Sequence, residues 1–400
     1  MIPPAADAAI GHNATERLAG PYLVLVSIDG FGWDYQARYE TPALDRLAAR
    51  GVRAKALRPV FPTLTFPNHY SIATGLYPAE HGIVGNDFPD DRRERWYSLW
   101  DRDTVQDGSW YGGEPVWVTA EKHGFVSAAY YFVGTEAAIQ GIAPSHWYPY
   151  DKTVPGDDRV DQVLEWLSMP AGRRPHVITL YFEDVDDAGH QAGPGTPQLA
   201  AAVRRVDGYI GRLLDGIAGL GIADDVYVVV VSDHGQSGYV DADAPFVIAD
   251  VVDLDGLKIV DGGSYASIYV SESGRAAAIR DAVNANWEHG RAWLRAETPP
   301  AWRVGDGARF PDVFVVADPR HAVLSRPSQS HRIKPGDHGW APEFRGMHGL
   351  FIAAGPRLPR GRTLGEISVV DVYPMMIEVL GIAGSDDATG PLLEILQPDD

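Results

Sequence analysis

The chain has 400 residues, of which 45% are hydrophobic and 22% charged, a composition typical of globular rather than disordered proteins. It contains 34 basic and 54 acidic residues, and the formal net charge of −20 argues against a general affinity for nucleic-acid backbones. Cysteine is absent, so disulfides, thiolate catalysis and cysteine-based zinc sites are excluded, and any metal must be held by His and carboxylate. No run of about 18 apolar residues is present, so we expect no membrane span.

Predicted strands and helices alternate along the chain. Residues 22–28 (YLVLVSI) form an apolar run typical of a strand buried on both faces of a parallel sheet. The next helix has clear start and stop signals, with Thr41 as N-cap, Pro42 at its first position and Gly51 at its end. Further strands are predicted at 125–132, 176–182, 226–231 and 350–354, and further helices at 157–167, 197–217 and 369–380. The alternation predicts an α/β fold whose mostly parallel central sheet is sandwiched by helices.

The stretch from about 257 to 330 has a different pattern. It contains short strand-like pieces at 266–270 and 313–316, one helix near 274–288, and many Gly, Pro and Ser residues. We therefore expect a small α+β subdomain inserted into a single domain that covers residues 21–400. Residues 1–20 are predicted to be an N-terminal tail that does not have the pattern of a signal peptide.

Chemically active side chains follow three of the predicted strands. In open α/β sheets, ligands bind beyond the carboxyl ends of the strands. Each group also has a plainer explanation, because polar residues commonly cap turns or form surface pairs. Taken together, three Asp and three His on turns at one edge of the sheet suit two zinc ions, since zinc prefers imidazole and carboxylate ligands when thiolate is absent. The candidate ligands are Asp29, Asp186, His190, Asp233, His234 and His338.

A candidate nucleophile lies at a predicted helix start. Thr65 is well placed as an N-cap, with Pro67 in the first turn. A hydroxyl at a helix N-terminus sits in a positive field where anions bind. The plain alternative is a capping threonine without catalytic function. Thr63 is a competing nucleophile, although the proline before it and the lack of a helix start count against it.

Five blocks in this order resemble the nucleotide pyrophosphatase/phosphodiesterase family of the alkaline phosphatase superfamily. They are SIDGF (27–31), PTLTFPNHYSIATGLYPAEHGIVGN (62–86), YFEDVDDAGHQAGP (181–194), SDHG (232–235) and GDHGW (336–340). The resemblance covers roughly residues 22–380. It implies a bacterial stand-alone catalytic domain, since the disulfide-rich accessory domains of animal members need cysteine, and it implies export from the cytoplasm to the periplasm or the medium.

The resemblance also implies a role for each matching residue. Thr65 matches the nucleophile, and Asn86 matches the residue whose amide contacts a non-bridging phosphate oxygen. Phe66 and Tyr181 match aromatic walls that stack on a nucleobase, with Tyr150 or Trp147 as weaker candidates. His69 is expected to be structural. One zinc would be held by Asp29, Thr65, Asp233 and His234, and the other by Asp186, His190 and His338.

The implied activity is zinc-dependent hydrolysis of nucleotide phosphodiester or pyrophosphate bonds through a covalent phosphothreonine, which releases nucleoside monophosphates. A phosphomonoesterase needs an additional cation for the extra phosphate charge, and no Arg adjoins Thr65. A lysophospholipid or choline-phosphate diesterase, and an inactive nucleotide-binding module, stay open as alternatives. The sequence departs from the family pattern at Asp184-Val185 and at Trp340-Ala341-Pro342, which affects the expected substrate preference rather than the ligands.

Overall fold

The computed structural model describes residues 11–272, 274–384 and 392. The first half of the predicted N-terminal tail and most of the last residues of the predicted domain therefore lie outside the described part. Within it, no helix has the length and apolar character that a membrane crossing requires.

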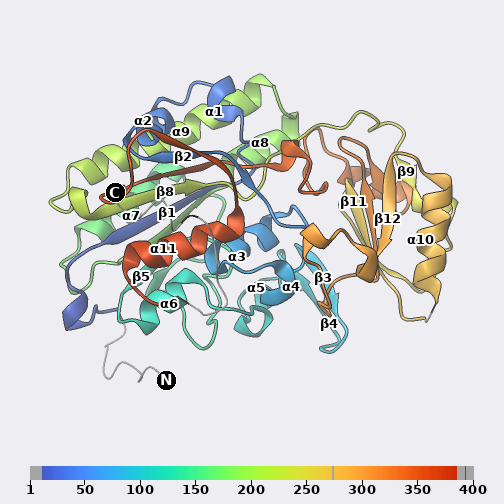
Figure 1. Cartoon of the computed structure of the whole chain (residues 1–400), viewed down its shortest axis with the longest axis horizontal. Coiled ribbons are helices and arrows are strands. Elements are labelled where there is room, and N and C mark those ends of the chain that lie inside the picture. Colours follow the sequence, from blue (N-terminus) through green and yellow to red (C-terminus); the bar gives the residue numbers. More distant parts are fainter. Residues whose placement is uncertain (1–10, 273, 385–391, 393–400) are drawn as a thin grey trace.

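The core of the molecule is an eight-stranded sheet with the order β16-β2-β15-β8-β1-β7-β5-β6 (Figure 1). Only β15 runs antiparallel to its neighbours, so the predicted, mostly parallel sheet is confirmed. The strands are β1 (Tyr22–Ile28), β2 (Val52–Arg58), β5 (Ser127–Tyr130), β6 (His146–Trp147), β7 (Val177–Phe182), β8 (Val226–Val231), β15 (Phe351–Ala354) and β16 (Arg362–Ser368).

Helices cover both faces of this sheet, as Figure 1 shows. One face carries α2 (Pro42–Arg50), α7 (Gly156–Ser168) and α9 (Pro197–Ala218), and the other carries α3 (Thr65–Thr74), α6 (Val116–Lys122) and α11 (Val372–Leu380). Strand β1 is buried along its whole length because its side chains alternate between the two layers. Val24 and Val26 pack with the first set of helices, and Leu23 and Leu25 with the second.

The capping of α2 differs from the sequence prediction. Thr41 occupies the N-cap position, but its hydroxyl makes no capping hydrogen bond. Asp207 of α9 takes this function, because its carboxylate accepts from the backbone N–H groups of Ala43 (3.0 Å) and Leu44 (2.9 Å). The predicted closing helix is also shorter at its start, since residues 369–371 form a 3-10 turn, η9 (Val369–Asp371), before α11.

A second, four-stranded antiparallel sheet lies beside the main sheet, at the right of Figure 1. It contains β10 (Lys258–Asp261), β11 (Tyr265–Tyr269), β13 (Val313–Ala317) and β12 (Gly290–Leu294), packed with α10 (Arg275–Asn286). Two of these strands and the helix match predicted elements to within two residues, whereas β10 and β12 were not predicted. The wider division into one domain with an insert at about 257–330 stays a prediction.

Short elements connect these layers. Two of them are the paired strands β3 (Asp87–Asp90) and β4 (Arg95–Ser98), and a two-stranded sheet joins β9 (Phe246–Val247) to β14 (Val323–Leu324). The short helices are α1 (Tyr35–Arg38), α4 (Pro78–His81) and α5 (Arg102–Val105), and α8 (Asp184–Ala192) follows β7.

The register of the central strands determines where the predicted site residues meet. Ile28 at the end of β1 pairs with Phe182 at the end of β7, and Ser27 pairs with Val231 at the end of β8. Because these three strands are parallel and end together, the residues after them lie at one edge of the sheet. Asp29, the start of α8 and Asp233 are therefore neighbours.

Candidate metal centre

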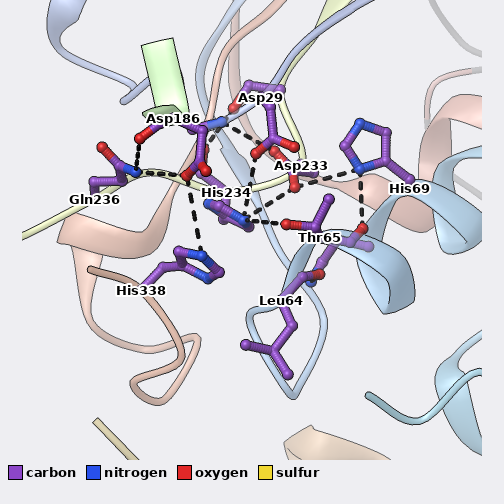
Figure 2. Close-up of polar contacts among 12 residues, drawn as sticks. Asp29, Leu64, Thr65, His69, Asp186, Asp233, His234, Gln236 and His338 are labelled. Carbon is purple, nitrogen blue, oxygen red and sulfur yellow. Dashed lines mark hydrogen bonds and ion pairs between the residues drawn. The ribbon is translucent and has the colours of Figure 1, made fainter. Parts of the chain in front are cut away.

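The sequence predicted Thr65 as the N-cap of α3, but in the structure Thr65 is the first residue of this helix. Leu64 takes the N-cap position with an extended backbone (φ −122°, ψ 155°). The Thr65 hydroxyl instead lies 3.4 Å from Nε2 of His234, toward the Asp and His cluster (Figure 2). The hydroxyl of the competing Thr63 is buried, donates to the carbonyl of Trp340 (2.7 Å) and accepts from Gly339 N–H (3.0 Å). Thr63 therefore holds a loop in place.

Asp29, Asp233 and His234 form a buried cluster beside Thr65 (Figure 2). Nε2 of His234 lies 3.0 Å from Oδ2 of Asp233 and 3.6 Å from Oδ1 of Asp29. The other oxygens of the two carboxylates are occupied, since Asp233 Oδ1 accepts from Gly30 N–H (3.2 Å) and Asp29 Oδ2 from the Tyr181 hydroxyl (2.7 Å). Asp29 Oδ1 and Asp233 Oδ2 are buried without a well-directed hydrogen bond from any described residue.

Asp186, His190 and His338 form a second cluster. Asp186 and His190 lie on one face of α8, four residues apart, with His190 Nε2 3.3 Å from Asp186 Oδ2. His338 reaches the same carboxylate from the loop after the second sheet, with its Nε2 4.0 Å from Asp186 Oδ1. The rings of His338 and His234 stack at 3.7 Å, so the two clusters adjoin.

The three imidazoles make the same kind of hydrogen bond. Nδ1 donates to a backbone carbonyl in each, from His190 to Gly336 (2.8 Å), from His338 to Thr63 (2.9 Å) and from His234 to Gly235 (3.1 Å). Because a carbonyl can only accept, Nδ1 carries a proton in each ring, and Nε2 is the nitrogen left for a metal ion. Each Nε2 lies toward the carboxylates, which is the arrangement of metal-binding histidines.

The electrostatics of the clusters also fit bound cations. Burial and the charges of Asp233 and Asp186 raise the pKa of Asp29 well above its ordinary value. Burial and the neighbouring imidazoles of His234 and His190 lower the pKa of His338, which favours its neutral, ligating form. Divalent cations would neutralise the carboxylates and accept the free Nε2 lone pairs. The buried, unbonded oxygens and this N/O donor set therefore fit metal ions such as zinc.

Ligand atoms from three groups of described residues lie within 4.8 Å of one another, and two of these groups share Asp29. One contains His69, but its Nδ1 donates to the Thr65 carbonyl (2.9 Å) and its Nε2 accepts from the Ser27 hydroxyl (2.8 Å). Both ring nitrogens are occupied, so the geometry favours the predicted structural role of His69. The groups are Asp186, His190 and His338; Asp29, His69 and Asp233; and Asp29, Asp186 and His234.

Gln236 is a contact of the cluster that the sequence did not predict. Its Nε2 donates to the side chain (2.5 Å) and to the carbonyl (3.0 Å) of Asp186. Gln236 comes two residues after His234, and no pattern in the sequence separates it from any other turn residue. Its position depends on the contact between the turn after β8 and α8.

The predicted substrate-binding residues are placed around Thr65 to different extents. Asn86 Oδ1 accepts from the backbone N–H of Phe66 (2.9 Å), so the amide group has one fixed orientation. Tyr181 donates to Asp29, and its ring lies 6.2 Å from that of Tyr150, which is 39% exposed. Trp147 lies on β6, the outermost strand of the sheet. The hydroxyl contact of Tyr181 with a candidate ligand was not predicted.

The histidine loop is bonded to the second sheet. Ser264, just before β11, donates from its hydroxyl to the His338 carbonyl (2.5 Å). Trp340 donates from Nε1 to the His321 carbonyl (3.0 Å), between β13 and β14. The second sheet thus supports the loop that carries His338.

Comparison with known proteins assigns the chain to a family. Residues 23–350 match the family model described as type I phosphodiesterase / nucleotide pyrophosphatase. Ectonucleotide pyrophosphatase/phosphodiesterase family member 1 from Rattus norvegicus is 32% identical over 388 residues, which cover 94% of this chain but 43% of the rat protein. Human family member 5 is 29% identical, and the alignment covers 90% of this chain and 74% of the human protein. The chain thus spans less than half the length of family member 1.

A solved structure of murine family member 5 has the same fold. It is an inactive threonine-to-alanine variant in complex with AMP, with a TM-score of 0.88 and 26% sequence identity, covering 94% of this chain and 99% of the murine one. The match to the family model extends over most of the chain. The chain therefore belongs to the type I phosphodiesterase / nucleotide pyrophosphatase family.

Proposed function

We propose that this protein hydrolyses nucleotide phosphodiester and pyrophosphate bonds with two zinc ions, through a phosphothreonine at Thr65, and releases nucleoside monophosphates. The observation that carries the proposal is the position of the Thr65 hydroxyl, at the N-terminus of α3 and 3.4 Å from His234 Nε2. A relative of the same fold supports it, because its threonine-to-alanine variant is described as inactive and binds AMP.

The donor sets suggest how the two ions would be held. Bound zinc ions would supply Lewis-acid stabilisation of the phosphoryl oxygens and favour an ionised threonine hydroxyl. Asp29, Asp233, His234 and Thr65 would hold one zinc, and Asp186, His190 and His338 the other.

The chain's own residues would carry out the bond-forming and bond-breaking steps. Thr65 Oγ1 forms a bond to phosphorus while the bond to the leaving oxygen breaks, and water then cleaves the phosphothreonine from the opposite side. Two in-line displacements predict net retention of configuration at phosphorus. The Asn86 amide would donate to a non-bridging oxygen, a contribution of about 3 kcal/mol. Phe66, Tyr150 and Tyr181 would contact the base.

Charge at the site favours diesters over phosphomonoesters as substrates. Among the described residues, no Lys or Arg forms an ion pair with Asp29, Asp186 or Asp233. A monoester carries one more negative charge than a diester and would need an additional cation there. A lysophospholipid or choline-phosphate diester fits the same metal clusters and is the second arm of the test.

The substrate test compares rates on a nitrophenyl nucleotide diester, nitrophenyl phosphate and nitrophenyl phosphocholine. We expect a clear preference for the nucleotide diester. A preference for the phosphocholine ester would replace the nucleotide assignment, and a preference for nitrophenyl phosphate would replace the diesterase assignment.

The nucleophile test uses Thr65→Ala, with Thr65→Ser as the matched variant that keeps a hydroxyl. We expect Thr65→Ala to lose turnover by more than about 10³-fold while it still binds about two zinc ions per chain, because six other ligands remain. Thr65→Ser should keep measurable turnover. Near-normal activity of Thr65→Ala would refute the covalent mechanism, and metal analysis without zinc in the active wild type would refute the assigned ions.

We also propose an extracytoplasmic location. The proposal is supported by relatives whose names describe ectoenzymes and a venom enzyme. Fractionation of the source cells checks it, and recovery of the protein in the cytoplasmic fraction alone would contradict it.

A further inference from the structure

Arg159 of α7 is a buried arginine that uses every donor it has. Its side chain is 2% exposed, and its five N–H groups make five hydrogen bonds to three acceptor residues. Nη1 and Nη2 form a bidentate pair with the two carboxylate oxygens of Glu183, at 2.7 and 2.8 Å. Nη1 also donates to the carbonyl of Tyr181 (2.9 Å), and Nε and Nη2 to that of Val154 (3.1 and 3.0 Å).

The acceptors lie in segments that lead to the metal centre. Tyr181 is at the end of β7 and donates from its hydroxyl to Asp29. Glu183 is the N-cap residue of α8, the helix that carries Asp186 and His190. Val154 is in the connection from Tyr150 to α7. The guanidinium therefore joins a residue that contacts the first cluster to the helix that provides the second.

Glu183 makes the arrangement unusual for a helix start. An acidic N-cap ordinarily accepts a hydrogen bond from the backbone of its own helix. Glu183 makes no such bond, and each of its two oxygens instead accepts a hydrogen bond from Arg159. The first turn of α8 is therefore oriented by a residue of α7 on the protein interior.

We propose that Arg159 and Glu183 are positioning residues that hold α8, with Asp186 and His190, in place against Asp29. The inference rests on the proposed two-metal function. A buried ion pair adds little net stability, because desolvation offsets the attraction, but a bidentate pair fixes both distance and direction. Outer contacts of this kind commonly change metal affinity by 10- to 100-fold.

The test measures zinc binding to metal-free protein by competition with a coloured chelator, together with urea unfolding and kinetics on a nitrophenyl nucleotide diester. We expect Arg159→Met to lower the affinity for the zinc ion assigned to Asp186, His190 and His338 about 10- to 100-fold. The affinity for the other zinc ion should stay within about threefold of the wild-type value, and kcat should fall more than KM rises. Glu183→Gln should show the same pattern with a smaller loss.

Two controls separate positioning from general destabilisation. Val163→Ala removes buried side-chain volume from the same helix without touching Glu183, so it should lower the unfolding midpoint and leave both zinc affinities unchanged. The double variant Arg159→Met with Glu183→Met replaces the ion pair by apolar side chains. Its unfolding midpoint should be higher than that of Arg159→Met, whereas its zinc affinity should be as low as in Arg159→Met.

The outcomes are distinguishable. Wild-type zinc affinities in Arg159→Met, an equal loss in Val163→Ala, or recovery of zinc binding in the double variant would each overturn the positioning role. If the wild type itself binds no zinc, the proposed function fails first, independently of Arg159.

Discussion

The Asn86 side chain makes one contact in the structure, and the proposed function requires a second. Its Oδ1 accepts from Phe66 N–H at the first turn of α3, which leaves the Nδ2 group as the donor available for a substrate oxygen. The family resemblance implied a phosphate-contacting role for this amide, but the sequence could not predict the bond to Phe66, because it joins residues 20 apart through the turn of the chain. The side chain is thus oriented before substrate arrives.

This orientation leads to a prediction that separates the two contacts. Asn86→Ala should lower kcat by about 10²- to 10³-fold through the lost donor and also reduce stability. Asn86→Asp keeps an acceptor for Phe66 N–H but has no donor, so it should lose as much activity while unfolding at a higher urea concentration than Asn86→Ala. Equal activity of Asn86→Asp and the wild type would argue against the donor role.

A buried histidine far from the catalytic edge gives a prediction of pH dependence. Burial lowers the pKa of His176 to about 4, and its Nδ1 donates to the carbonyl of Pro21 (2.8 Å). The unfolded chain therefore binds a proton near pH 6.5 that the folded chain does not, so stability is full above that pH and is lost as the pH falls toward 4.

At pH 5 the loss from His176 should amount to about 2 kcal/mol of unfolding free energy. Urea unfolding at pH 7 and pH 5 measures this loss. His176→Gln should be less stable than the wild type at pH 7, but its free energy of unfolding should fall correspondingly less between pH 7 and pH 5. An unchanged pH dependence in His176→Gln would contradict the assignment.

At the scale of the elements, long apolar runs were predicted best. The strands at 22–28 and 226–231 have the predicted bounds, because residues buried on both faces must be apolar throughout. Strand β2 was missed since its sequence VRAKALR contains three basic residues and only three of its seven residues are buried. Its identity comes from pairing with β15 and β16, which follow far along the chain.

The same distinction applies to helix ends. Sequence signals placed the start of α2 correctly, yet the group that caps it is Asp207, brought there by α9. Local patterns likewise found the Asp and His residues at the strand ends. Gln236 and the Arg159–Glu183 pair could not be found, because tertiary packing creates their contacts.

Removing the tertiary cap should weaken α2 without affecting catalysis. We expect Asp207→Ala to lower the unfolding free energy by about 1–2 kcal/mol, because two buried N–H groups lose their acceptor. Asp45→Ala is the matched control, since Asp45 is in the first turn of the same helix and exposed to solvent. Urea unfolding and kcat measure both effects. If Asp207→Ala is fully folded and still loses much of its kcat, the expectation that this cap does not affect catalysis is wrong.

At the scale of the whole molecule, bound metal and folding should be coupled. Without a cation, the carboxylates of Asp29 and Asp233 are buried next to each other, each with one oxygen that lacks a well-directed hydrogen bond, which is costly. We expect chelator treatment to lower the thermal midpoint, and added zinc to raise it in a concentration-dependent manner. A ligand at 100 times its Kd stabilises by about 2.7 kcal/mol per site.

Differential scanning calorimetry of chelated and zinc-loaded protein measures this coupling. Asp29→Asn with Asp233→Asn removes the two negative charges, so this variant should be more stable than the wild type in chelator and should gain less from zinc. Thermal midpoints that do not depend on zinc would contradict the assignment of the buried carboxylates to a metal.

The wide spacing of the candidate ligands has a consequence for how the protein is made. They extend from Asp29 to His338, and the loop of His338 is bonded to the second sheet through Ser264 and Trp340. A chain emerging from the ribosome presents Asp29 early but completes the second cluster only after residue 338 and that sheet are available. Loading of both proposed metal positions would therefore come late in biogenesis, and metal content would report that the chain has been made beyond residue 338 and has folded.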